Sequence, residues 1–178
     1  MLQMFRFSVV VVCLLSLAGS AHAAKPEDLF KGRIIITANR LPTRFASSNA
    51  FVAALRSQNI DKVWPKEEKG NDYAVWKLEY IAFFAQPLND NEITVKFWET
   101  FPGRRYVAGD EQYIREKGSR IFASSIELAK PDFEVNKKYS MTIERGGRVL
   151  ARTEFWLRGK GPNYSGKVEL TDEEAKVR

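Results

Sequence analysis

The fold class is decided by residues 139–157, YSMTIERGGRVLARTEFWL. Tyr139, Met141 and Ile143 alternate with polar residues, and the apolar residues resume in alternation after the glycine pair 146–147. Strict alternation on both sides of a Gly-Gly pair is typical of two antiparallel strands joined by a tight turn. This stretch therefore predicts a β-hairpin with one face turned to a core.

The register of this hairpin decides which side chains share a face. A two-residue Gly-Gly loop would set Met141 opposite Arg152 and put a charge on the apolar face. We therefore predict a three-residue loop, 145–147, with Gly147 left-handed in a bulge. That loop pairs Met141 with Ala151, and it also pairs Ile143 with Val149 and Glu144 with Arg148. A slip of one residue would move every side chain to the other face.

The face opposite the core is basic in this register. Residues 137–160 hold seven lysines and arginines against two glutamates. The predicted binding residues on that face are Arg148, Arg152, Trp156 and Arg158. An arginine-flanked indole on an open sheet suits a sugar ring or an anionic partner. The alternative is that outward arginines only protect an exposed strand from pairing with other chains. Trp98 beside Lys96 repeats the pattern more weakly.

Further strands are expected on either side of a single helix. Residues 33–37 and 120–128 are β-branched or alternating and read as strands, while 106–117 is ambiguous. Residues 73–86 and 93–98 alternate around a turn-rich break and are predicted to form a hairpin. Residues 47–59 are the one convincing helix, with Ser47 or Ser48 as its cap. Short strands with Pro and Gly breaks and one inserted helix indicate an antiparallel β-sandwich.

One stretch before the last hairpin carries a resemblance. Leu128, Pro131, Phe133 and Tyr139 stand in LAKPDFEVNKKY. This resembles the approach to the penultimate strand of fibronectin type III and other immunoglobulin-like domains, over residues 119–159. The resemblance implies an immunoglobulin-like β-sandwich with a tyrosine corner, in which the Tyr139 hydroxyl bonds to nearby backbone. The helix and the missing Cys-Trp-Cys pattern depart from an ordinary immunoglobulin domain.

The N-terminus has the pattern of an export signal. A ten-residue apolar run, 8–17, is followed by Ala21-His22-Ala23, which suits signal peptidase. We expect a signal peptide at 1–23, one β-sandwich domain at 24–160 and a partly docked tail at 161–178. Cleavage would remove the only cysteine, Cys13, and the only histidine, His22. The mature chain then has no disulfide, no Cys/His zinc site and no Ser-His-Asp triad.

The same part of the sequence also limits the expected location of the protein and its expected ligands. Ser20 stands where a lipid-bearing cysteine would be, so we expect no lipid anchor and no transmembrane segment after cleavage. The expected location is periplasmic or extracellular, in a bacterium rather than a eukaryote. Removal of Arg6 lowers the net charge from +6 to +5. We expect no cofactor, no metal and no nucleic-acid partner.

Three functions remain open. The first is an exported, non-enzymatic β-sandwich that binds an anionic envelope polymer or a protein partner. The second is an exported hydrolase that acts on glycans through carboxylates, although Asp110-Glu111 and the other adjacent acids in the sequence usually only solvate a surface. The third is an assembly or chaperone-like component that pairs through a strand edge. We identify no catalytic residue from the sequence.

Overall fold

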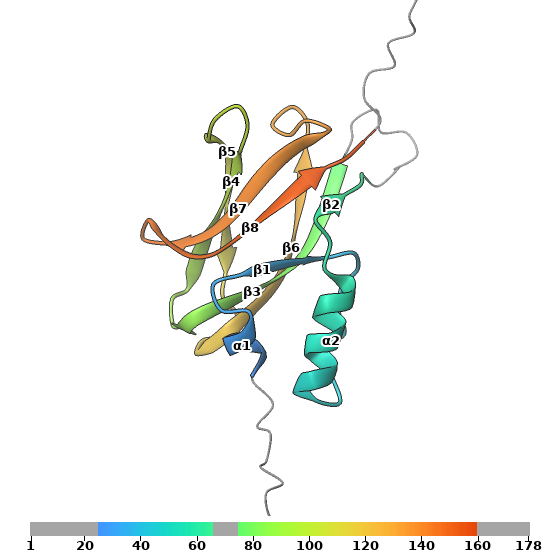
Figure 1. The fold of residues 1–178 in the computed structure, drawn as a ribbon. Helices are drawn as coiled ribbons and strands as arrows, with labels where there is room; N and C mark the ends of the chain where they lie inside the picture. Colours follow the sequence, from blue (N-terminus) through green and yellow to red (C-terminus); the bar gives the residue numbers. More distant parts are fainter. Residues whose placement is uncertain (1–24, 66–74, 160–178) are drawn as a thin grey trace, which may run out of the picture.

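The computed structural model describes residues 25–65 and 75–159 (Figure 1). The expected signal peptide and the expected tail lie outside these residues. The described residues form two helices and eight strands: α1 (Pro26–Leu29), β1 (Ile34–Thr37), α2 (Ser48–Gln58), β2 (Lys62–Val63), β3 (Val75–Leu88), β4 (Glu92–Glu99), β5 (Arg105–Tyr113), β6 (Ser119–Ala129), β7 (Lys137–Arg145) and β8 (Arg148–Leu157).

The strands form two sheets that pack face to face. One sheet has three strands in the order β1-β3-β6, and the other has five in the order β2-β8-β7-β4-β5. Neighbouring strands run antiparallel, except for β2 and β8, which are parallel. A single apolar cluster contains side chains from both sheets. The predicted antiparallel β-sandwich is therefore confirmed.

The core lies where alternating residues of β3 meet those of β4, β7 and β8. Trp76 and Tyr80 of β3 are at most 1 % exposed. From the other sheet, Phe97 and Phe155 pack edge to face, with their ring centroids 6.4 Å apart. Burial of one such aromatic side chain stabilises the fold by about 1.5–3 kcal/mol, so this row supplies much of the stability of the sandwich.

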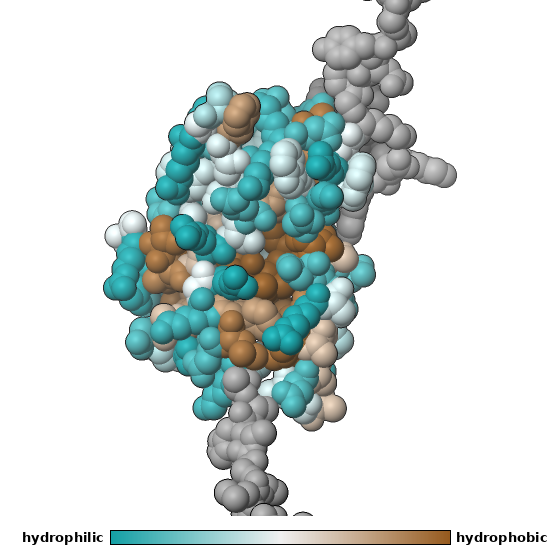
Figure 2. Space-filling model, viewed as in Figure 1, coloured by the Kyte–Doolittle hydropathy of each residue, from teal (hydrophilic) through white to brown (hydrophobic). Residues whose placement is uncertain are grey.

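The two helices cover the outer face of the three-stranded sheet. A second apolar cluster joins Phe30, which follows α1, with Leu55 of α2 and Phe83 of β3. The Ser47 side chain accepts a hydrogen bond from the Ala50 N–H at 3.1 Å, which caps α2 as predicted. Figure 2 shows hydrophobic surface in the middle of this view, where β1 and the two helices meet. Among the described helices, neither is long and apolar enough to cross a membrane.

The predicted hairpin between residues 73–86 and 93–98 is wrong. Both segments are strands, but β3 belongs to the three-stranded sheet and β4 to the five-stranded one. Because the two helices and Leu41 cover the outer side of β3, its residues from Tyr80 to Phe84 are buried on both faces. The chain then crosses from one sheet to the other between Leu88 and Glu92. Alternation of residue types identifies a strand but does not reveal its sheet.

The last hairpin is confirmed, and its predicted register is wrong. Arg145 pairs with Arg148, so the loop is the two glycines alone, both with positive φ as a type I′ turn requires. Glu144 pairs with Val149 and Ile143 with Ala151, so Leu150 is an extra residue in β8. This bulge sets Thr153, and not Arg152, opposite Met141. The bulge therefore keeps the charge of Arg152 off the core face, although the loop has only two residues.

The tyrosine corner is present as the resemblance implied. The Tyr139 hydroxyl accepts a hydrogen bond from the Glu134 N–H at 2.9 Å. Tyr139 itself is 1 % exposed, and Leu128 and Phe133 are buried in the same cluster. This corner fixes the chain between β6 and β7, where it passes from the three-stranded to the five-stranded sheet.

Candidate binding face

The candidate site is the face of the five-stranded sheet that is turned away from the core, called the outer face below. On β8, Arg152 and Trp156 point to this face, since they alternate with the buried residues Ala151, Phe155 and Leu157. Arg158 follows β8, and its guanidinium carbon lies 4.6 Å from the centroid of the Trp156 ring. Three of the four predicted binding residues therefore lie together.

Arg148 does not lie with them. Its partner across the hairpin is Arg145, which alternates with the buried Ile143 and so belongs to the inner side of β7. The extra residue at Leu150 separates Arg148 from Arg152 and reverses the expected side. The predicted placement of Arg148 on this face is thus wrong, because a bulge shifts the alternation on one side of itself only.

A second indole on the outer face was undervalued from the sequence. Trp98 of β4 lies 4.2 Å below the guanidinium carbon of Arg104 and packs edge to face against Tyr106, centroid to centroid 5.4 Å. Its Nε1 donates to the Thr142 hydroxyl at 3.2 Å. The signal in the sequence was Trp98 followed at short range by Arg104. What the sequence lacked was the strand order, in which only β7 separates β4 from β8.

Two ion pairs are built into the same face. Lys138 pairs with Glu154 at 2.5 Å, and Lys96 pairs with Glu144 at 2.7 Å. Glu144 is 6 % exposed and also accepts from the Thr142 hydroxyl at 3.0 Å. Because Glu144 is buried and bound by both Lys96 and Thr142, it joins neighbouring strands and leaves little capacity for a ligand cation.

The remaining cations of the face are not neutralised in this way. Within the described residues, Lys62, Arg104, Arg152 and Arg158 are among those that form no ion pair. Lys62 of β2 pairs in register with Trp156, which places it beside the Arg158 stack. The face thus offers positive charge at its two aromatic positions, with paired charges between them.

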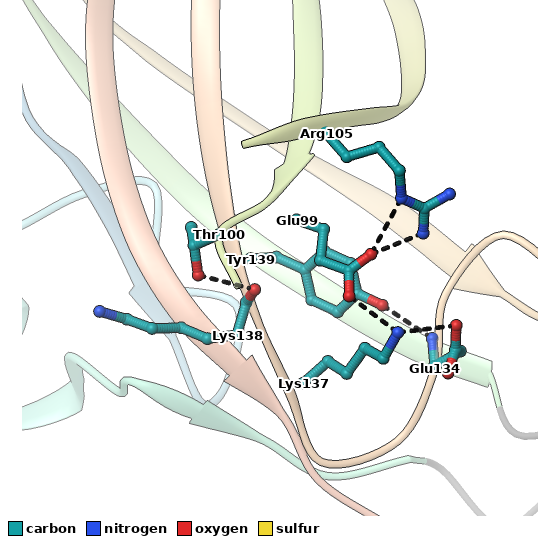
Figure 3. A network of polar contacts seen from close by, with 7 residues as sticks. All are labelled: Glu99, Thr100, Arg105, Glu134, Lys137, Lys138 and Tyr139. Atoms are coloured by element: carbon teal, nitrogen blue, oxygen red, sulfur yellow. Dashed lines mark hydrogen bonds and ion pairs between the residues drawn. The ribbon is translucent and has the colours of Figure 1, made fainter. Parts of the chain in front are cut away.

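A separate ion cluster lies where β4 ends and where β5 and β7 begin (Figure 3). Glu99 is 4 % exposed and binds Lys137 at 2.7 Å and Arg105 at 2.5 Å. These two hydrogen-bonded cations lower the pKa of Glu99 below its ordinary value, against the effect of burial. Arg105 begins β5 and binds this buried carboxylate. The cluster is internally neutralised, so it serves structure.

The adjacent acids Asp110 and Glu111 do not form a pair. In β5 they pair with Val95 and Thr94 of β4, one of which is buried in the core and the other turned outward. Successive residues of a strand point to opposite faces, so these two carboxylates diverge. Within the described ranges, no three His, Cys, Asp or Glu side chains are grouped so as to hold a metal ion.

Comparison with known proteins yields little beyond the fold. No protein-family model matches the chain, and no curated protein matches it. Among solved structures it is similar to an immunoglobulin-like protein, PA1606, from Pseudomonas aeruginosa, with 17 % sequence identity and a TM-score of 0.37. The match covers 72 % of this chain and 94 % of that one. The likeness concerns the fold alone.

Proposed function

We propose that this chain is an exported, non-enzymatic β-sandwich that binds an anionic partner of the cell envelope or extracellular space through the outer face. The observation that carries the proposal is the pair of arginine–indole stacks, Arg158 on Trp156 and Arg104 on Trp98, on one sheet surface. Export rests on the sequence pattern of residues 1–23 and is part of the proposal.

The stacks define the chemistry of the partner. An indole stacked on a guanidinium covers one flat face of the guanidinium. The N–H groups at the edge of the guanidinium stay free to donate hydrogen bonds. A guanidinium held in this way loses less conformational freedom when it binds a carboxylate, phosphate or sulfate group with two hydrogen bonds. Because each arginine already covers one face of its indole, an acidic group fits this surface better than a sugar ring stacked on the tryptophan.

The test compares a sulfated dextran with the same dextran unsulfated, since the two polymers differ in charge and share their sugar. We expect the mature protein to bind the sulfated form alone and to bind it more weakly as salt rises. Exposed charges more than about 8 Å apart are largely screened at physiological ionic strength. The Arg152→Glu, Arg158→Glu double variant should lose binding by at least about tenfold, which equals ~1.4 kcal/mol.

The matched control carries the same charge change elsewhere. Arg148→Glu combined with Arg56→Glu alters two exposed arginines, one at the hairpin turn and one on α2, both off the outer face. This control should keep most of the binding. Equal losses in the two double variants would mean that net charge alone attracts the polymer, and the proposal would then be wrong.

The third function, pairing through a strand edge, concerns a different part of the molecule and is developed below. Glu99, Glu144 and Glu154 are each bound to a cation of the same chain, and Asp110 and Glu111 point to opposite faces, so these five carboxylates do not support the hydrolase hypothesis.

A further inference from the structure

Strand β6 has one open edge. It pairs with β3 over a ladder whose register is unbroken from Val75–Ala129 to Phe83–Ile121. Within the described residues, nothing pairs with its other side, since β6 ends the three-stranded sheet. Between Arg120 and Glu127 it reads Ile-Phe-Ala-Ser-Ser-Ile, six uncharged residues without a proline. Such an edge is a template for an added strand.

The hydrogen bonds of β3 show which backbone groups on β6 are free. Phe83 donates to Arg33 and accepts from Gly32, so its N–H and C=O face the β1 side. The backbone groups of successive residues in a strand point alternately to its two neighbouring strands. The N–H and C=O groups of Tyr80 and Ala82 therefore point to β6. Their partners in register are Ser124 and Phe122. The backbone N–H and C=O groups of Ala123, Ser125 and Glu127 therefore point away from β3, toward the open edge of the sheet.

Ile121 supports this assignment independently. Its N–H donates to the Ser119 hydroxyl at 3.0 Å, and its C=O accepts from the same hydroxyl at 2.7 Å. A backbone pair bound by a side chain of its own strand is not in the ladder with β3. The outward groups are thus covered at Ile121 and open at Ala123 and Ser125, both of which have exposed side chains.

The other sheet edges, in contrast, are protected against pairing with an added strand. β5 ends the five-stranded sheet, but its pairing with β4 is interrupted near Trp98, and it carries Arg105, Asp110 and Glu111. β1 has four residues and β2 has two. Bulges, charges and short length are the usual means of blocking edge pairing. Only β6, among the described strands, combines length with a regular and uncharged edge.

A buried polar group lies directly behind this edge. Tyr80 is 1 % exposed, and its hydroxyl has no hydrogen-bond partner in the described protein. Ser124, its partner in register, donates its own proton to Gln112 Oε1 at 2.7 Å. A cleft of about 1010 Å³ crosses β6 here, and its lining includes Tyr80, Ala123 and Ser125. An incoming strand therefore has space at this edge.

The inner side of β6 specifies what such a strand should carry. Phe122 and Ile126 are half-buried and flank Ser124 at a spacing of two. An added strand would cover both if it placed apolar residues opposite them and a small polar residue opposite Ser124. That pattern is apolar, any, small polar, any, apolar. Residues 122–126 of this chain, Phe-Ala-Ser-Ser-Ile, have it themselves.

We propose that β6 pairs with β6 of a second copy, antiparallel about a two-fold axis at Ser124. The pairing sets Phe122 against Ile126 of the partner subunit, and Ala123 against Ser125 of the partner subunit. The two three-stranded sheets then join into one six-stranded sheet. An aromatic against a β-branched side chain is a favourable cross-strand pair. The partner's Ser124 is brought to the axis, on the side of the sheet that Tyr80 occupies.

The first test is the mass of the full mature protein by sedimentation equilibrium over a range of concentrations. The wild type should be dimeric at high concentration and dissociate on dilution. Ala123→Pro should be monomeric throughout, because it removes an outward N–H and places a ring in the path of the partner. Its circular dichroism and thermal midpoint should stay near those of the wild type, since that N–H makes no bond to β3.

The second test reads the register with two double variants of equal bulk. Ala123→Glu with Ser125→Glu sets like charges across both central pairs and should dissociate the dimer. Ala123→Glu with Ser125→Lys sets opposite charges across the same pairs and should preserve it. A register centred on residue 123 or 125 would put like charges opposite each other in both variants, so both would then dissociate.

Three results would overturn the proposal. They are a wild type that is monomeric at its highest soluble concentration, a dimer that survives Ala123→Pro, and two double variants that behave alike. A monomer that instead captures an unrelated strand peptide would assign the edge to a different partner. Binding of sulfated dextran is a separate readout, because the outer face belongs to the other sheet.

Discussion

The two sheets turn very different outer faces to their surroundings. On the three-stranded sheet, outward residues such as Ile35, Ile81 and Phe83 are apolar, and the two helices and Leu41 bury them. On the five-stranded sheet, the corresponding positions hold ion pairs and arginine–indole stacks. A strand whose outward residues are apolar needs a cover, and the helices supply it. The polar face is left without one among the described elements, which makes it the candidate surface for a partner.

The largest effect should come from breaking the covered face. Phe83 is fully buried between Phe30 and Phe51, with ring centroids 5.2 Å and 6.3 Å away. Phe83→Ala should lower the free energy of unfolding by about 3–5 kcal/mol, as other deletions of buried aromatics do. Chemical denaturation measures it. A loss below about 1 kcal/mol would mean that the helices contribute little and that the two faces differ only in composition.

The buried carboxylate of Glu99 can be compared with the carboxylates of the outer face for its effect on stability. Glu99→Gln removes one partner of two charged hydrogen bonds and should cost about 1.5–3 kcal/mol. Because the folded protein lowers the pKa of Glu99, its contribution is full above the ordinary pKa of a glutamate and is lost as pH falls through the lowered value.

The measurement is unfolding free energy against pH. The Glu99→Gln variant should lose less stability than the wild type between neutral and acidic pH. Glu116→Gln, at an exposed loop position, corrects for the change in net charge. Parallel acid profiles for the wild type and the Glu99→Gln variant would contradict the role given to the Glu99 cluster.

The sequence was sufficient for most of the strands, but not for β2, for β5 in the ambiguous stretch 106–117, or for the arrangement of the strands. Ser47 and the alternation around Tyr139 identified the cap of α2 and the last hairpin, since both signals are local. The bulge at Leu150 was missed because it is a backbone irregularity with no residue signature of its own. The sheet to which β4 belongs was also missed, since the paired residues of its partner β7 lie forty or more positions away in the chain.

The prediction of the candidate site failed at two points for the same two reasons, the bulge and the unknown strand order. Arg148 was misplaced by the bulge, and Trp98 was undervalued because strand order brings it near Trp156 and sequence distance does not. Arg152, Trp156 and Arg158 were found because they lie on the same side of the bulge, where simple alternation holds. Local periodicity therefore predicts a face reliably only within one uninterrupted strand.

A smaller effect tests whether the outer face must be polar for stability. Glu144→Leu alone leaves Lys96 and the Thr142 hydroxyl without their partner and should cost about 1–2 kcal/mol. Adding Lys96→Met should recover most of that loss, because a charged pair and a well-packed apolar pair are often equally stable. Recovery would indicate that polarity here serves solubility or binding. Loss in both variants would indicate that the pair itself stabilises the sheet.

The smallest effect on stability concerns Trp156, and it separates a binding face from a packed one. Trp156 is partly exposed and stacks under Arg158, so Trp156→Ala should cost less than about 1 kcal/mol in unfolding free energy. Its effect on binding of sulfated dextran should be larger in proportion, because the indole holds the guanidinium in place. Trp156→Phe keeps an aromatic surface and should retain more binding than the alanine variant. A stability loss as large as that of Phe83→Ala would show that Trp156 is buried in the full chain, and the outer face would then no longer be an open surface.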